Sequence, residues 1–127
     1  MLVKDCMVRH PILIPPSMRA QEVERIMAEN NIRHLPVVTS GKRLAGLMTR
    51  QRLALNPADM SSLNVWEISR YLSGLKVQDL MIGAPDVITI TPDRTIERAA
   101  KIMSERKIGC LPVVEDGGVV VGILTEI

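Results

Sequence analysis

Phenylalanine is absent from this chain of 127 residues, and Trp66 and Tyr71 are its only aromatic residues. Proteins that bind single-stranded nucleic acid usually stack bases on aromatic side chains, and this sequence lacks such platforms. It also lacks a dense basic stripe, because 16 basic and 14 acidic residues are spread along the chain and leave a net charge of +2. Both features argue against a nucleic-acid partner.

Long apolar runs are missing too. Although 46% of the residues are hydrophobic, no apolar stretch reaches the roughly eighteen residues of a membrane-spanning helix, and no secretory leader is recognisable. We therefore expect a cytoplasmic protein without a membrane partner. The only two cysteines, Cys6 and Cys110, are each set beside apolar residues, which favours buried, reduced thiols over a disulfide.

Catalytic signatures are also lacking. The sequence has no Gly-x-Ser-x-Gly elbow, no phosphate-binding glycine-rich loop ending in Lys-Ser/Thr and no His-Glu-x-x-His motif. Its two histidines, His10 and His34, do not share a metal-ligand spacing with either cysteine. We expect neither an enzyme nor a metal site.

What the sequence does contain is one pattern that occurs twice. Residues 35–38 and 111–114 both read Leu-Pro-Val-Val, and each run is followed by a glycine turn and by Gly-aliphatic-aliphatic-Thr, ending at Thr49 and Thr125. A repeated unit of this size cannot bury its apolar face alone and stacks on its copy. The chain is accordingly divided into a first repeat at 1–60, a helical connector at 61–76 and a second repeat at 77–127.

Each repeat is expected to run strand, helix, strand, strand. In the first repeat, residues 12–14 predict an apolar strand closed by two prolines, and residues 19–30 predict a helix with Ser17 as N-cap. Residues 32–48 predict a hairpin that turns at 39–42.

The second repeat follows the same order. Its first strand is expected at 87–90, its helix begins near residue 96 with Asp93 or Thr95 as cap, and its hairpin turns at 115–118. A short turn of helix, Val-x-Asp-x-Met, precedes each repeat, at residues 3–7 and 77–81.

The connector carries an amphipathic helical stripe formed by Val65, Ile68, Leu72 and Leu75. Its lone Trp66 is interpreted as an anchor packed between the two repeats in preference to a ligand contact. The second repeat stops before the helix that follows Thr49 in the first repeat, so we expect the chain to continue beyond Ile127.

The order of lead-in, proline-closed strand, helix, Leu-Pro-Val-Val strand and Gly-aliphatic-aliphatic-Thr strand resembles the CBS domain. Its tandem copy resembles the CBS pair known as a Bateman module. Residues 63–68 and 108–114 are similar to the acetoin-utilisation type, in which an ACT domain often follows the pair. The resemblance implies an α+β fold of tandem β-α-β-β-α repeats, packed sheet to sheet with pseudo-two-fold symmetry around two clefts for adenosyl ligands.

The family's ligand motif is Gly-aliphatic-aliphatic-Thr/Ser-x-x-Asp, in which the hydroxyl holds phosphate and the carboxylate accepts from the ribose hydroxyls. In the first repeat Thr49 matches, but Arg52 stands in the Asp position. A guanidinium has no acceptor for a ribose hydroxyl, which compromises AMP binding in the family manner, whereas it can hold a polyphosphate bidentately. In the second repeat Thr125 matches and the sequence ends before the Asp position.

Other family positions fall on Arg33 and His34, which nucleotide-sensing members place against phosphate. The alternative is that Arg33 is a solvated strand residue and His34 a hydrogen-bonded sheet residue, and the sequence leaves both open. The resemblance further implies that adenine is held by the entry loop and first strand of each repeat. Four candidates lie in the entry loops, His10, Pro11, Ile82 and Pro85, and a fifth, Thr91, lies near them.

Two functions are consistent with these features. In the first, the pair is a regulatory module that binds AMP, ADP, ATP or S-adenosylmethionine and passes its state to an attached domain. In the second, it has lost its ligand and serves as a dimerisation scaffold, for which Arg52 is the best support. Helix faces that carry Met18, Met27 and Met103 suggest a homodimer, although methionines at these positions also fill a core.

Overall fold

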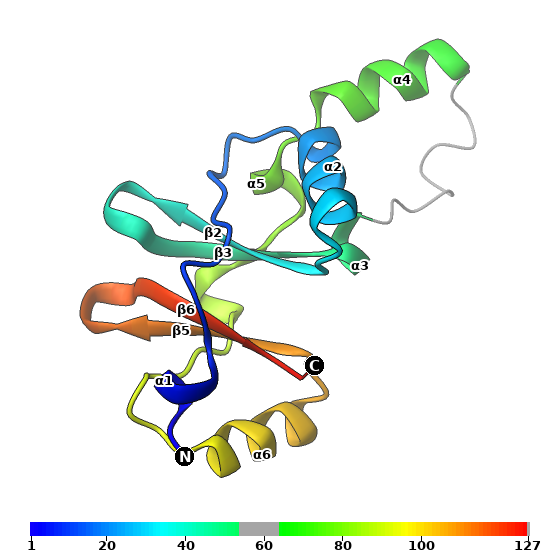
Figure 1. Ribbon diagram of the computed structural model, residues 1–127. Coiled ribbons are helices and arrows are strands. Elements are labelled where there is room, and N and C mark those ends of the chain that lie inside the picture. Colours follow the sequence, from blue (N-terminus) through cyan, green and yellow to red (C-terminus); the bar gives the residue numbers. More distant parts are fainter. Residues whose placement is uncertain (54–63, 127) are drawn as a thin grey trace.

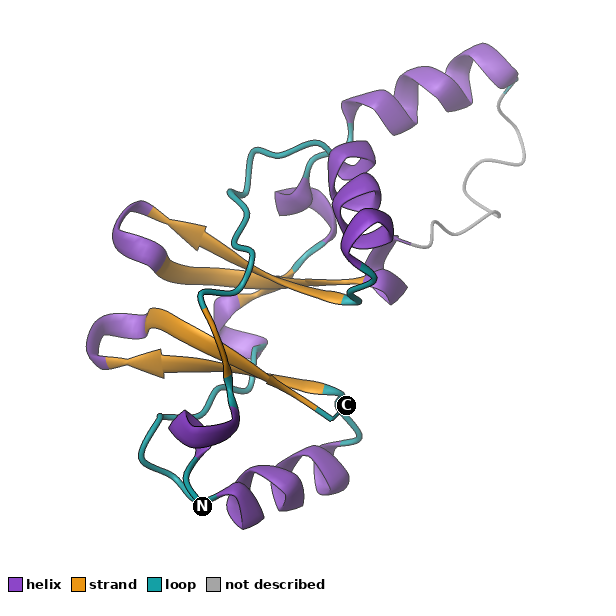
Figure 2. Cartoon of the chain, viewed as in Figure 1, coloured by secondary structure: helices purple, strands orange, loops and turns teal. Residues whose placement is uncertain are grey.

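Two antiparallel β-hairpins lie next to each other in the middle of the molecule, and one long helix covers the outer side of each (Figures 1 and 2). The computed structural model describes residues 1–53 and 64–126. The two halves have the same order of elements, as the repeated sequence predicts. The mixed fold and the pseudo-symmetric pairing of the repeats are therefore confirmed.

The first half and the connector contain these elements: α1 Val3–Cys6, β1 Val8–Arg9, α2 Ala20–Asn30, β2 His34–Thr39, η1 Ser40–Lys42, β3 Arg43–Thr49, α3 Arg50–Leu53 and α4 Val65–Gly74. The second half contains α5 Val77–Leu80, β4 Ile82–Gly83, η3 Ala84–Asp86, α6 Ile96–Arg106, β5 Cys110–Glu115, η4 Asp116–Gly118 and β6 Val119–Thr125.

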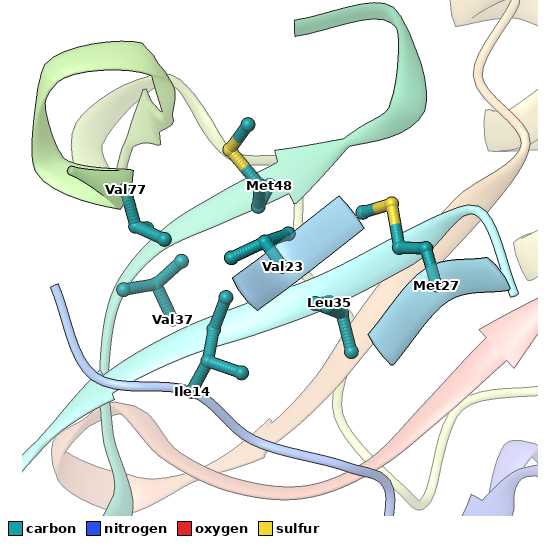
Figure 3. Close-up of a cluster of buried hydrophobic side chains, with 7 residues drawn as sticks. All are labelled: Ile14, Val23, Met27, Leu35, Val37, Met48 and Val77. Atoms are coloured by element: carbon teal, nitrogen blue, oxygen red, sulfur yellow. The ribbon is translucent and has the colours of Figure 1, made fainter. Parts of the chain in front are cut away.

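Each half has its own apolar core between its long helix and its hairpin. In the first, side chains of α2, β2 and β3 are joined by Ile14 and Val77, and all are at most 1% exposed (Figure 3). The second core is built in the same way under α6. A smaller cluster of Leu47, Cys110 and Ile123 comes from both hairpins and closes the seam between them. The two cores and the seam cluster are thus formed without aromatic side chains, and the burial of mostly aliphatic side chains stabilises the fold.

The lead-in turns are present where the sequence predicts them, but each one packs on the opposite repeat. Val3 of α1 is fully buried in the core under α6, and β1 pairs with β6 in the register Val8 to Ile123. Val77 of α5 is buried under α2, and β4 pairs with β3 in the register Ile82 to Leu47. The chain therefore crosses between the halves twice, while the division at 1–60, 61–76 and 77–127 remains a prediction.

The predicted first strands are reduced to single bridging residues. Ile14 donates to the Pro36 carbonyl and accepts from Val38, and Ile90 does the same with Pro112 and Val114. Prolines flank these segments and cannot donate to a ladder, which prevents longer pairing.

The helix caps agree with the sequence in one repeat only. Thr95 is the N-cap of α6, and its side chain accepts from the Arg98 amide. Ser17 is not the cap of α2: that position is Arg19, whose backbone pairs with Lys76 and so fixes where the helix begins.

Two predicted burials are wrong or only half right, and for the methionine Met27 the alternative of a core position is confirmed. Trp66 is 79% exposed on α4, which projects away from the hairpins, so it does not anchor the repeats (Figure 1). Cys110 is buried as expected, but Cys6 is exposed, and both are free thiols. Met27 is 1% exposed within the first core, so it fills the interior and is not free to pack against a second copy.

Candidate functional site

A cleft of about 650 Å³ lies between the carboxyl end of β3 and the loop that follows β4, and we call it the first cleft. It brings together five of the residues predicted from sequence: Arg33, His34, Thr49, Arg52 and Ile82. These residues come from four separate segments of both repeats. Their convergence depends on the seam between the hairpins.

Thr49 ends β3 and organises the turn into α3. Its Oγ1 accepts a hydrogen bond from the Arg52 amide at 3.2 Å, and the Arg50 amide donates to the Arg33 carbonyl at 3.0 Å. The Thr49 hydroxyl keeps its own proton as a donor toward the cleft. The backbone therefore holds Thr49, Arg33 and Arg52 as one unit.

Gly46 allows the loop of the first cleft to approach. A Cβ at this position would lie 2.4 Å from the Ile82 carbonyl oxygen, closer than any real Cβ contact. Gly122 has the same function in the second repeat, where a Cβ would lie 2.9 Å from the Val8 carbonyl oxygen. The first glycine of the repeated motif is thus needed for the close pairing of β4 with β3 and of β1 with β6.

Positive charge dominates the first cleft. Arg33, Arg50, Arg52 and Lys107 line it against the two carboxylates of Asp86 and Glu126. Fixed cations facing one small volume attract anions, and arginine is suited to bidentate contact with phosphate.

His34 lies at the seam, beside the Glu126 carboxylate. Burial lowers the pKa of the His34 imidazole below its usual value, the charge of Arg33 lowers it further, and Glu126 acts in the opposite direction. Gly109 leaves room for both side chains, because a Cβ there would lie 3.2 Å from Glu126 Oε1 and 3.5 Å from His34 Cε1. His34 is therefore neutral near pH 7, available as one donor and one acceptor.

A second cleft of about 520 Å³ occupies the pseudo-symmetric position beside β1 and β6. It contains the predicted residues His10, Pro11 and Thr125, and it shares Arg33 and His34 with the first cleft. The two clefts therefore have a common wall at the seam.

Two of the predicted residues line neither of these clefts. Pro85 lies in the short turn η3 and does not line the first cleft, although Asp86 of the same turn does. Thr91 donates to the Asp93 carboxylate at 2.7 Å and belongs to the turn that leads into α6. Their assignment to an adenine site has no support from this geometry.

Sequence reasoning missed Arg50 and Lys107, which also line the first cleft. Lys107 follows the last residue of α6 with a left-handed φ of 56°, and its equivalent Asn31 follows α2 with φ 51° and lines the second cleft. A residue that ends a helix in this way redirects the chain toward the seam. Comparing the two helix ends in the sequence would have found Lys107, whereas Arg50 follows Thr49 directly in the repeated motif.

None of the helices within residues 1–53 and 64–126 has both the length and the apolar character needed to span a bilayer. Within the same ranges, no three His, Cys, Asp or Glu side chains gather as metal ligands.

Comparison with known proteins identifies the family to which this chain belongs. The family model for the CBS domain matches residues 3–58 and 77–127. A homoserine O-acetyltransferase of Methanohalobium evestigatum is 33% identical over 125 residues, which are 98% of this chain and 22% of that protein. The chain thus spans about a fifth of the length of this curated relative.

Two solved structures have the same fold. A Vibrio cholerae protein assigned to acetoin utilization (AcuB) has a TM-score of 0.82 and 30% identity, covering 99% of this chain and 84% of that one. The CBS domain pair of protein MJ0100, in complex with 5′-methylthioadenosine and S-adenosyl-L-methionine, has a TM-score of 0.77 and 29% identity, covering 98% and 89%. With two family matches on two equivalent halves, the chain belongs to the CBS domain family and forms a CBS pair.

Proposed function

We propose that this CBS pair is a regulatory module that binds an adenine nucleotide in the first cleft and passes the bound state to an attached domain or partner. The observation that carries the proposal is the convergence of Thr49, Arg33 and Arg52 on one cleft between the repeats. The adenosyl ligands of the MJ0100 pair support it from a protein of the same fold.

The charges of the first cleft predict an order of affinity among the candidate ligands. Arg52 replaces the acceptor that the family uses for ribose, so the cleft gains a phosphate contact and loses a sugar contact. One added charge-assisted hydrogen bond is worth about 1.5 kcal/mol or more, which is roughly tenfold in affinity. We therefore propose ATP and ADP above AMP. S-Adenosylmethionine ranks last, because its sulfonium would meet the same arginines.

A ligand in the first cleft would contact both repeats. Thr49 and Arg52 belong to the first hairpin and its helix, whereas Lys107 and Gly109 lead into the second hairpin. A ligand shifts an arrangement only by binding one state more tightly than another. The proposed lever is the relative position of the two hairpins, with α4 and α5 as the covalent link.

A ligand-free scaffold is the second candidate. Two observations favour it: Arg52 in the ribose position, and the exposed apolar side chains Val65 and Trp66 of α4, which are 83% and 79% exposed. In that case α4 would dock on a second copy of the chain, giving a homodimer through helices.

Calorimetry and thermal shift with AMP, ADP, ATP and S-adenosylmethionine separate the two candidates. A ligand at a hundred times its Kd stabilises the fold by about 2.7 kcal/mol. Arg52→Ala should weaken ATP by about tenfold, whereas Arg106→Ala, an exposed site on α6, serves as the matched control and should not. Flat melting curves with all four compounds would reject the sensor and leave the scaffold.

A further inference from the structure

A third cleft of about 580 Å³ lies between the N-terminal segment and the turns of the two hairpins. Four of its lining side chains are basic or histidine: Lys4, Arg9, His10 and Lys42. Glu115 is the one carboxylate among the lining residues, and the remaining surface is apolar, with Leu13 and Val121 among its members. None of its lining residues lines the first cleft, so the two are separate, whereas His10 and Pro11 also line the second cleft.

The repeat provides an internal comparison for these positions. Val8 pairs with Ile123 on β6 just as Ile82 pairs with Leu47 on β3, which fixes the equivalence of the two lead-in segments. In the same way, the hairpin turns η1 and η4 are equivalent. Each residue of the third cleft therefore has a counterpart that performs the same structural task in the other repeat.

All four cationic or titratable residues have neutral counterparts. Lys4 corresponds to Gln78, Arg9 to Gly83, His10 to Ala84 and Lys42 to Gly118. Because the second copy folds in the same way with neutral residues, the fold does not require positive charge here. The charge has accumulated on one side of a pseudo-symmetric molecule, at one cleft.

The backbone conformation at two of these residues also indicates that their side chains are retained for a purpose other than folding. Lys42 has a left-handed φ of 59°, at a position where its counterpart is glycine with φ 76°. His10 also has a left-handed φ, of 55°. A side chain in this region carries a strain of about 1 kcal/mol or more. Lysine thus occupies a position where glycine would remove the backbone strain.

The cations of this cleft are not neutralised by ion pairs. Within residues 1–53 and 64–126, no salt bridge involves Lys4, Arg9 or Lys42. Arg9 Nη2 donates to the Lys4 carbonyl at 3.2 Å, which holds the guanidinium next to the lysine. Three exposed positive charges therefore face a half-apolar cavity with one carboxylate, Glu115, in its lining, and the Asp93 carboxylate outside the lining interacts with Lys4 alone among the three.

From this asymmetry we propose that the third cleft binds a small organic phosphate. The phosphate would be held by Lys4, Arg9 and Lys42, with His10 as an additional donor, and the organic part would lie against the apolar surface. A phosphate offers several acceptor oxygens, which matches donors that come from three separate elements. The ligand would join the N-terminal segment to the turns of both hairpins.

NMR titrations of the full chain with inorganic phosphate and with phenyl phosphate test the proposal at constant ionic strength. We expect saturable shifts of the amides of Lys4, Arg9, Lys42 and residues 119–121. Phenyl phosphate should bind at least about threefold more tightly than inorganic phosphate, because its ring covers apolar surface.

The variant Lys4→Gln/Lys42→Gly copies the residues of the other repeat and should weaken phenyl phosphate by about tenfold or more. Its control, Lys101→Gln/Arg106→Gln, removes the same charge from exposed positions of α6 and should change the affinity less than about twofold. Shifts confined to the first cleft, equal affinity for the two probes, or equal losses in the two double variants would each overturn the proposal.

Discussion

Gly46→Ala tests whether the close pairing of β3 and β4 positions the first cleft. The new Cβ would lie 2.4 Å from the Ile82 carbonyl oxygen, and ordinary contact begins at 3.4 Å, so β4 must retreat by about 1 Å. Overpacking costs 1–3 kcal/mol, and the lost ladder hydrogen bonds add about 1 kcal/mol. We expect the free energy of unfolding to fall by about 3 kcal/mol and Tm by roughly 10 °C.

The matched control is Gly83→Ala, which changes the residue directly opposite Gly46 in the ladder. A Cβ there meets only Pro85 Cδ at 3.8 Å, an ordinary contact. Urea unfolding and thermal melts of both variants should therefore differ clearly, and Gly46→Ala should also weaken nucleotide binding because Ile82 moves. If the two variants melt within about 2 °C of each other, the close approach does not determine stability.

Three further predictions concern single side chains. Arg52→Asp restores a ribose acceptor and removes a phosphate contact, so calorimetry should show AMP gaining on ATP by roughly tenfold. Burial lowers the pKa of His34, so the unfolded chain binds its proton more readily; stability should be complete above about pH 6.5 and fall as the pH drops further, with less fall in His34→Asn. Burial raises the pKa of Cys110 to about 12, so a thiol reagent at pH 8 should modify the exposed Cys6 and leave Cys110 intact.

Each of these predictions has a clear contrary result. An unchanged AMP to ATP ratio in Arg52→Asp would show that this residue does not face the phosphates. Identical urea midpoints at pH 7.5 and 5.5 for the unsubstituted chain would contradict neutral burial of His34. Rapid modification of two thiols in native protein, or of one in Cys6→Ser, would mean that the seam around Cys110 opens.

The hairpins and helices could be predicted from the sequence because their signals are local. The Leu-Pro-Val-Val runs, the glycine turns and the helical spacing from Val23 to Met27 all act within a few residues of one another. The predicted hairpin already brings Arg33 beside Thr49, because the start of β2 pairs with the end of β3. That these residues and Arg52 face a ligand cleft came from the family resemblance, since the opposite wall of the cleft lies far along the chain.

Other features depended on partners distant in the sequence. The hydrophobic pattern of the lead-in turns predicts that Val3 and Val77 are buried, but not which core receives them. The stripe around Trp66 predicts a helix, yet no pattern within the helix states whether its apolar face meets the same chain. The role of Gly46 also depends on Ile82, a residue far along the chain.

The exchange of the lead-in segments sets the order in which the protein can be completed during synthesis. Within the pair, residues 1–9 are made before the other described elements, but their partners are α6 and β6, and β6 is the last of the described strands. Val3 and Val8 must therefore wait until almost all of the pair has been translated, while the first hairpin and α2 can already associate. Deleting residues 1–9 would consequently damage the second repeat, which is made after the first.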